Sequence, residues 1–185
     1  MKKVLAFIVA LLPLLACAQS FVLTPNGFVN ADDTTKSYIV VNVEGTQAEL
    51  FQKAKTAVTS MWNSPKDVLS FNEPDIIIVN GVATDLLSIK MIVTVPYDLP
   101  YRLQLQFKDG RVRIDAPSAT KAVNIERRSD LYLSAGKNGA ATFYFWNRKG
   151  ELKQEKNKQK AEDYFNALIS TIINKLKNGA AQEDW

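Results

Sequence analysis

Apolar side chains first alternate with other residues and then recur at a helical spacing. Residues 37–44 follow the alternation of a strand buried mainly on one face, with inward positions at Ile39, Val41 and Val43. After Gly45 the apolar residues recur every three to four positions, which predicts an amphipathic helix over residues 46–62. Thr46 and Glu49 have the spacing of a capping box, in which each side chain binds a free backbone N–H at the helix start.

A series of strands is predicted after this helix. Residues 76–79 and 82–85 flank an Asn-Gly pair at residues 80–81, and such a pair favours the tight turn of a hairpin. Residues 89–95 form a further expected strand, which Pro96 would end because proline lacks the N–H that a sheet requires.

The clearest hairpin joins residues 101–107 to residues 111–116 through the turn residues Asp109 and Gly110. The register then pairs apolar residues with one another: Phe107 with Val112, Leu105 with Ile114, and Leu103 with Ala116. The other face of the hairpin is polar, so we expect it to meet water or a partner while the helices cover the apolar face. Its side chains are those of Arg102, Gln104, Gln106, Arg111, Arg113 and Asp115.

The last third of the chain contains an irregular stretch, an aromatic strand and a long helix. Residues 117–142 lack a clear period and are expected to form an irregular insertion. In the aromatic strand at residues 143–146, alternation allows only one pair to face the core, either Phe143 and Phe145 or Tyr144 and Trp146. The closing helix is predicted over about residues 151–177, with an inner face of Ala161, Phe165, Leu168, Ile172 and Leu176.

The order of elements predicts an α+β fold. A strand, a helix, several strands and a closing helix follow one another without a repeat or a linker, which indicates one domain over residues 19–185. We expect an antiparallel sheet of about five to seven strands with two helices packed on one face.

The first 18 residues have the pattern of an export signal. Lys2 and Lys3 precede an uncharged apolar run that is too short for a membrane span and ends in small residues, so residues 1–18 are predicted to be a signal peptide. Ala16 and Ala18 fit ordinary secretory cleavage, whereas the sequence around Cys17 also fits a lipoprotein box in which that cysteine carries a lipid. The protein would then be periplasmic or secreted in the first case, and anchored to the envelope membrane in the second.

The composition excludes most catalytic chemistry from the folded part. The chain has no histidine, and Cys17 is its only cysteine, so an exported domain beginning near Gln19 lacks an imidazole or thiol for catalysis or metal binding. No phosphate loop, nucleophile elbow or clustered metal motif is present, and no cofactor is predicted. The formal net charge is +4, which becomes +2 without Lys2 and Lys3.

Several short motifs resemble a family of small exported bacterial proteins. They lie at residues 21–29, 38–41, 64–69, 107–114 and 145–147. The chain resembles domain-of-unknown-function family 4468, whose fold is like that of the TATA-binding protein. The resemblance implies a TBP-like order of strand, helix, strands and helix, and it implies no catalytic residue.

These observations predict a non-catalytic module of the cell envelope that binds a protein, a glycan or a small ligand. The candidate binding residues lie on the polar sheet face and the aromatic strand: Arg102, Gln104, Arg111, Arg113, Tyr144 and Trp146. Nucleic acid is not an expected partner, because the predicted face mixes its arginines with glutamines and Asp115. The membrane is expected to be a partner only through a lipid on Cys17. The alternative is a hydrolase acting on glycans or peptides through a pair of carboxylates among Glu73, Asp75, Asp85 and Asp115.

Overall fold

The computed structural model describes residues 19–178, so the predicted signal peptide and Cys17 lie outside the described residues. Three helices and ten strands follow one another within these described residues. They are β1 (Phe21–Thr24), β2 (Gly27–Asn30), β3 (Tyr38–Asn42), α1 (Gln47–Thr59), α2 (Pro65–Val68), β4 (Leu69–Asn72), β5 (Ile76–Lys90), β6 (Thr94–Lys108), β7 (Arg111–Asp115), β8 (Lys121–Asn124), β9 (Ser129–Gly136), β10 (Thr142–Asn147) and α3 (Glu155–Asn178).

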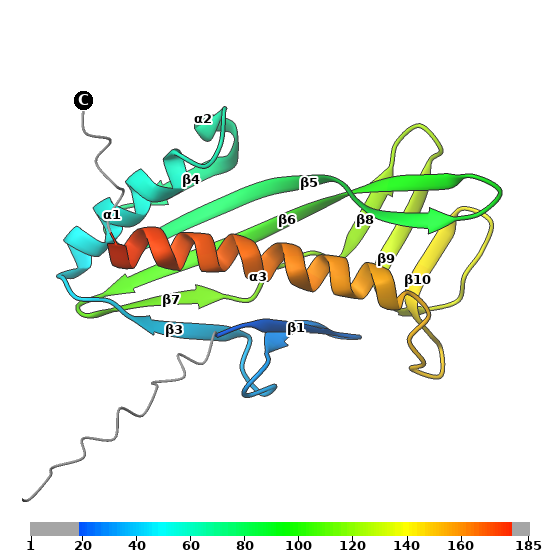
Figure 1. Cartoon of the computed structure of the whole chain (residues 1–185), viewed down its shortest axis with the longest axis horizontal. Coiled ribbons are helices and arrows are strands. Elements are labelled where there is room, and N and C mark those ends of the chain that lie inside the picture. Colours follow the sequence, from blue (N-terminus) through cyan, green and yellow to red (C-terminus); the bar gives the residue numbers. More distant parts are fainter. Residues whose placement is uncertain (1–18, 179–185) are drawn as a thin grey trace, which may run out of the picture.

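Two long strands organise the main sheet (Figure 1). β5 and β6 pair antiparallel along most of their length, and β4 extends the sheet beyond β5. On the other edge of β6, β7 and then β3 follow at one end, while β8, β9 and β10 follow at the other. The sheet has eight strands, slightly more than the expected five to seven, and only β9 and β10 pair in parallel. β1 and β2 form a separate hairpin, which the sequence pattern did not reveal.

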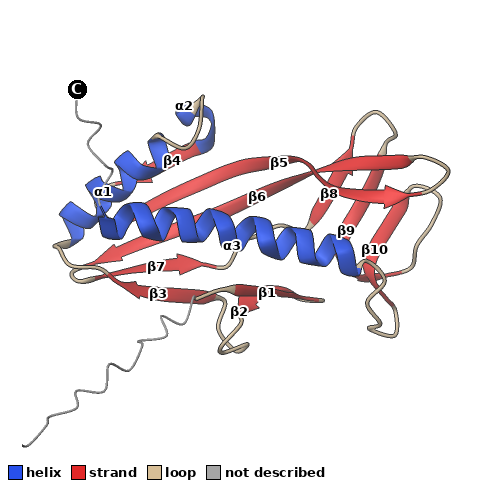
Figure 2. Ribbon diagram, in the orientation of Figure 1, coloured by secondary structure: helices blue, strands red, loops and turns tan. Residues whose placement is uncertain are grey.

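Helices α1 and α3 cover one face of this sheet (Figure 2), as the predicted α+β fold requires. The centre of the core is aromatic: the Phe165 ring of α3 meets Phe28 and Tyr101 edge to face, each with 5.1 Å between ring centroids. Side chains of α3 also bind the edge of β1, because Asn166 and Glu162 accept the backbone N–H groups of Phe21 and Leu23. Within residues 19–178, neither α1 nor α3 lies on the opposite face of the sheet, and we call it the open face.

The predicted start of α1 is confirmed. The Thr46 hydroxyl accepts the backbone N–H of Glu49, and the Glu49 carboxylate accepts the backbone N–H of Thr46 at 2.8 Å. The Thr46 hydroxyl also donates to the Glu49 carboxylate, at 3.0 Å. The bonds from the Thr46 N–H and the Thr46 hydroxyl to this carboxylate hold the pKa of Glu49 below its ordinary value, because both favour the ionised form. The buried residues of the helix are among those that the periodicity predicts: Leu50, Phe51, Ala54, Ala57 and Val58.

The expected hairpin at residues 80–81 is wrong. Both residues lie inside the continuous strand β5, and the chain turns instead at residues 91–93. Gly81 faces Tyr101 across the sheet, and a Cβ atom at Gly81 would lie 2.4 Å from that side chain. The absence of a side chain at Gly81 therefore leaves room for the Tyr101 ring, and the residue does not form a turn. Pro96, expected to end a strand, lies inside β6.

The hairpin around Asp109 and Gly110 is confirmed in two of its three predicted pairs, Phe107 with Val112 and Leu105 with Ile114. The predicted pairing of Leu103 with Ala116 is wrong. The Ala116 N–H donates to the carbonyl of Ser37, and Arg102 bridges to Ser118, so the register shifts beyond Leu105.

The last third of the chain is more regular than expected. Residues 117–142, predicted to be an irregular insertion, contain β8 and β9, which extend the main sheet. The closing helix begins at Glu155 rather than at residue 151, because the N–H groups of Lys153 and Gln154 bind the Phe145 carbonyl and keep this segment beside β10. Its buried face includes Ile169, while Leu168 is only partly buried.

Candidate functional site

The open face is built by strict alternation along β6 and β7. Leu103, Leu105 and Ile114 turn their side chains into the core, and each is fully buried. The residues between them must therefore point to the helix-free side. The predicted binding residues Arg102, Gln104, Arg111 and Arg113 all lie on this face, together with Gln106 and Asp115.

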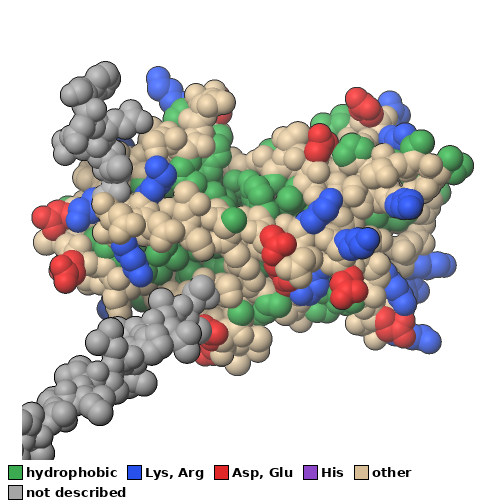
Figure 3. All heavy atoms as spheres, in the orientation of Figure 1, with side chains coloured by type: hydrophobic (Ala, Val, Ile, Leu, Met, Phe, Trp, Pro, Cys, Tyr) green, Lys and Arg blue, Asp and Glu red, His purple; other side chains and the backbone are tan. Residues whose placement is uncertain are grey.

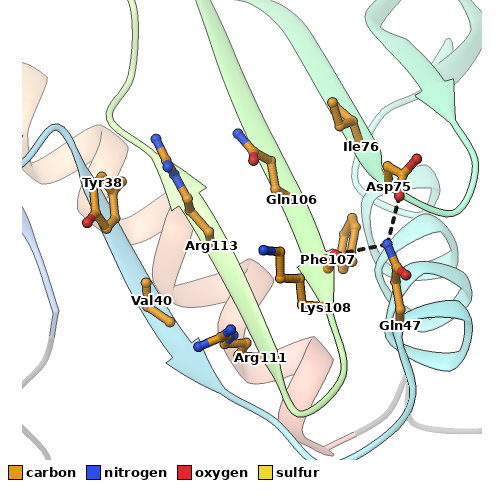
Figure 4. Close-up of a pocket in the computed structure, with 10 residues that line it drawn as sticks. All are labelled: Tyr38, Val40, Gln47, Asp75, Ile76, Gln106, Phe107, Lys108, Arg111 and Arg113. Carbon is orange, nitrogen blue, oxygen red and sulfur yellow. Dashed lines mark hydrogen bonds between the residues drawn. The ribbon is translucent and has the colours of Figure 1, made fainter.

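A cavity of about 380 Å³ opens on this face (Figure 4). We call it the cationic cavity. Strands β3, β5, β6 and β7 supply most of its wall, and the start of α1 supplies one side chain. Its lining residues are Tyr38, Val40, Gln47, Asp75, Ile76, Gln106, Phe107, Lys108, Arg111 and Arg113.

A hydrogen-bonded network around Asp115 holds two side chains of the cavity wall, Arg113 and Gln106. The Asp115 carboxylate accepts the Nε–H of Arg113 at 2.6 Å and amide N–H groups from Gln104 and Gln106 at 3.1 Å each. The Arg113 guanidinium also lies over the Tyr38 ring, 4.1 Å from its centroid. Asp115 therefore compensates the charge of Arg113, and the network holds Gln106 at the cavity wall.

Two other cations of the cavity have no such compensation. Lys108 and Arg111 are cross-strand partners on β6 and β7, and like charges in this position destabilise a sheet. Neither side chain makes a hydrogen bond or ion pair with the residues that the structure describes. The unpaired positive charge is therefore available to a ligand.

One residue, Gln47, binds two carboxylates, that of Asp75 at the cavity wall and that of Asp109 at the adjoining turn. Its backbone N–H donates to Asp109 at 2.8 Å, and its Nε2–H donates to Asp75 at 2.7 Å. The same Nε2 also donates to the Phe107 carbonyl, 3.1 Å away. Gln47 thus ties the start of α1 to the rim of the cationic cavity and holds the Asp75 carboxylate by a hydrogen bond.

The wall of the cavity is apolar between the charged groups. Val40, on the edge strand β3, is 36% exposed, and Ile76 is half-buried beside Gln106. Such a wall accommodates a ligand that combines a negative group with a less polar body.

Of the six predicted site residues, Arg111 and Arg113 line this cavity. Two others lie beside it, and the remaining two lie elsewhere. Arg102 and Gln104 are linked to each other and reach the cavity only through Asp115. Tyr144 lies on β10, where its ring stacks on Tyr132 at a centroid distance of 5.1 Å. The expectation for Trp146 is wrong because its side chain is buried, with 5% exposure.

A bulge explains why the alternation in the aromatic strand fails. The register of β10 against β9 shifts between Tyr144 and Trp146, so that Phe145 and Trp146 are both buried although they are adjacent. Neither of the predicted alternating pairs describes this strand.

Sequence reasoning missed most of the cavity wall. Lys108 could have been found, because it precedes the turn residue Asp109 and continues the outward positions of Gln104 and Gln106. Gln47 and Ile76 carry no such signal, since only the three-dimensional fold brings them to this face.

The four carboxylates considered for a hydrolase do not gather in this cavity. Glu73 pairs with Lys55, Asp115 pairs with Arg113, and Asp75 is the only acidic residue among those that line the cavity. Asp85 lines a different cavity, of about 300 Å³, together with Asp98 and Glu126. Across residues 19–178, no group of three or more acidic residues is placed to hold a metal ion.

Comparison with known proteins shows the fold. Two solved structures resemble the chain: a TBP-like protein from Parabacteroides distasonis ATCC 8503 and a DUF4468 family protein from Bacteroides ovatus ATCC 8483. The first is 13% identical with a TM-score of 0.54, and the match covers 75% of this chain and 90% of that one. The second is 12% identical with a TM-score of 0.50, and the match covers 80% of this chain and 88% of that one.

The TBP-like α+β fold is therefore confirmed, and the names of these proteins state no activity. No family model matches the chain, and no curated protein matches it significantly. None of the helices between residues 19 and 178 is both long enough and apolar enough to cross a membrane.

Proposed function

We propose that the protein is an exported, non-catalytic binding module of the cell envelope, and that its cationic cavity holds an organic anion. The observation that carries this proposal is the pair Lys108 and Arg111, two adjacent cations without a partner among the described residues at the mouth of an open cavity. A sheet tolerates such a repulsive pair at a cost in stability, and an anionic ligand removes that cost.

The chemistry of the wall suits a carboxylate on a partly apolar body. A guanidinium such as that of Arg111 can donate two parallel hydrogen bonds to one carboxylate, and the Lys108 ammonium adds a mobile point charge. Val40 and Ile76 offer contact to the body of the ligand, and Gln106 offers an amide held in place by Asp115. An acidic sugar or the carboxyl end of a peptide has this combination of groups.

A binding role accounts for the cavity better than hydrolysis does. Glycoside hydrolysis generally requires two carboxyl groups on opposite sides of the scissile bond. The cationic cavity has Asp75 alone among its lining residues, and that carboxylate accepts a hydrogen bond from Gln47.

A nucleic-acid ligand fits the open face less well than a small anion. Binding to a phosphate backbone uses cations spread along the whole contact surface. On this face Arg113 is neutralised by Asp115, and the wall next to Lys108 and Arg111 contains Val40 and Ile76.

The proposed location in the envelope is supported by the sequence of residues 1–18, with its basic start, apolar run and small residues before Gln19. Mass spectrometry of the mature N-terminus separates the two modes of export. An unmodified chain that begins at Gln19 indicates a periplasmic or secreted protein, and a lipid-modified Cys17 indicates a membrane anchor. A retained Met1 overturns the proposal of export.

NMR of the isotopically labelled chain from Gln19 onward tests the binding site. The probes are matched pairs that differ in charge: trigalacturonate against galactotriose, and a hexapeptide with a free against an amidated carboxyl end. We expect at least one anionic member to shift the resonances of Lys108, Arg111 and Ile76, and its neutral counterpart to leave them in place.

The Lys108→Gln/Arg111→Gln variant should weaken this binding about tenfold or more, since each charged hydrogen bond contributes about 1.5–3 kcal/mol. A Lys66→Gln/Lys177→Gln variant is the matched control, because both lysines are exposed and neither lines the cavity. The proposal is wrong if no anionic probe shifts the cavity, or if the control weakens binding as much as the cavity variant.

A further inference from the structure

The turn between β5 and β6 exposes three consecutive apolar side chains. Met91 is 46% exposed, Ile92 is completely exposed and Val93 is 52% exposed. We call these three residues the apolar tip. Apolar residues that are exposed singly are common on proteins, but a consecutive apolar run at the end of a long hairpin points to a contact that covers it.

The apolar tip is convex and well supported. The two strands remain paired up to Lys90 and Thr94, and inside the turn the Met91 N–H donates to the Val93 carbonyl at 3.1 Å. The three side chains therefore extend outward from a short, hydrogen-bonded turn. A projecting turn of this kind can insert among the acyl chains of a lipid bilayer, whereas it has little area to match a flat protein surface.

Lysines surround the base of the apolar tip. Lys90 and Thr94 line a cavity of about 420 Å³ together with Lys153, which precedes α3, and with Lys156 and Lys160 from the start of that helix. Lys153 pairs with Glu151, whereas Lys90, Lys156 and Lys160 make no ion pair with any described residue. Figure 3 shows many Lys and Arg side chains at this end of the molecule, with Asp and Glu side chains among them.

A second turn at the same end has a similar character. Ile125, between β8 and β9, is 80% exposed, and Glu126, Arg127 and Arg128 follow it. Glu126 lines a cavity with Asp85 and Asp98, so the basic side chains of this turn are those of Arg127 and Arg128 alone. The preceding Asn124 donates its side-chain N–H to the carbonyl of Pro96 near the start of β6, which holds this turn beside the hairpin.

We infer that this end of the molecule docks on an anionic lipid bilayer, with the apolar tip inserted among the lipids and Lys90, Lys156 and Lys160 against the phosphate groups. Apolar insertion and attraction of basic residues to anionic lipids act together in peripheral membrane binding. The inference is independent of the cationic cavity, which lies at the opposite ends of β5 and β6. It is also independent of a lipid on Cys17.

Vesicle sedimentation tests the inference on the chain from Gln19 onward. Every described strand and helix and the whole described core lie in that part, and the apolar export segment, which would itself partition into lipid, is absent. We expect binding to vesicles of equal parts phosphatidylglycerol and phosphatidylcholine. Binding should weaken with added salt and be at least tenfold weaker on phosphatidylcholine alone.

Two pairs of variants separate the apolar and the ionic contributions. Ile92→Ser should weaken binding about tenfold, while Val82→Ser, at an exposed valine elsewhere on β5, should leave it unchanged. Lys156→Gln/Lys160→Gln should weaken binding by a similar factor, and Lys66→Gln/Lys177→Gln should not.

A fluorescent label reports insertion directly. The chain from Gln19 onward has no cysteine, so Ile92→Cys provides a single attachment point for an environment-sensitive dye. Its emission should shift to the blue with anionic vesicles, whereas the same dye at Val82→Cys should not respond. The inference is overturned if the intact domain does not bind these vesicles, or if the label at residue 92 stays in water. Either result would favour a protein partner for the apolar tip.

Discussion

The Gly81→Ala substitution tests whether a glycine inside β5 is needed for the approach of a neighbouring ring. Gly81 and Tyr101 face each other across β5 and β6, and an added Cβ would lie 2.4 Å from both Cζ and the hydroxyl oxygen of Tyr101. The ring cannot easily move aside. It meets Tyr164 and Phe165 edge to face, and its hydroxyl accepts the hydroxyl of Tyr164 at 3.2 Å.

The expected cost follows from two opposing effects. Overpacking of a well-packed core costs about 1–3 kcal/mol, and loss of an aromatic pair costs about 0.5–1.5 kcal/mol more. Alanine itself stabilises a strand interior by about 0.5–1 kcal/mol relative to glycine. We therefore expect Gly81→Ala to lower the free energy of unfolding by about 2 kcal/mol, which corresponds to a fall in Tm of about 4–8 °C for a domain of this size.

Urea unfolding followed by circular dichroism measures this change. Gly139→Ala is the matched control, because an added Cβ at Gly139 meets nothing within 4 Å and that glycine is exposed. A second control combines Gly81→Ala with Tyr101→Leu, which removes the obstructing ring. In that background the added methyl group should cost at least about 1 kcal/mol less. The reasoning is refuted if Gly81→Ala costs no more than Gly139→Ala.

Three further predictions concern single side chains. Asn157→Ala should lower the free energy of unfolding in urea by about 2–3 kcal/mol. The reason is that the Asn157 amide accepts the N–H of Ser88 on β5 and donates to the carbonyl of the same residue. A cost near zero would contradict this role. Thr46→Ala should cost about 1 kcal/mol and raise the pKa of Glu49 in an NMR titration, since the hydroxyl helps to hold that pKa down. Because the folded-state pKa of Glu49 lies below its ordinary value, its stabilising contribution is complete above the ordinary pKa and is lost as the pH falls through the folded-state value. The Tm difference between wild type and Glu49→Gln should therefore shrink on acidification, and a difference that grows would contradict the capping box.

The elements that the sequence predicted correctly are those with local causes. The capping box of Thr46 and Glu49 needs only four residues, and the Asp109-Gly110 turn fixes the register of the two strands next to it. The same register places Arg111 and Arg113 on the open face, so part of the cationic cavity was predictable from alternation alone.

The errors arise where a distant residue decides the local structure. Asn80-Gly81 has good turn chemistry, yet Tyr101 packs over the glycine and keeps the chain extended. Phe145 and Trp146 are both buried because the bulge in β10 breaks the alternation, and nothing in the four aromatic residues marks its position. Both effects are tertiary, and a pattern read along the chain does not contain them.

The apolar tip shows a more general limit of sequence patterns. Residues 91–93 are apolar and lie within the largely apolar stretch of residues 89–95, so the sequence pattern assigns them to a strand. Hydrophobicity, however, states only that a side chain avoids water, and both a core and a lipid bilayer satisfy that condition. The distinction requires knowing where the hairpin turns, and the turn lies at residues 91–93 because β5 and β6 stay paired from Ile76 and Gln106 out to Lys90 and Thr94. A Gly81→Ala domain that stays folded should consequently keep the same turn at residues 91–93, and its vesicle binding should remain within about twofold of the wild type once the fraction of folded protein is taken into account.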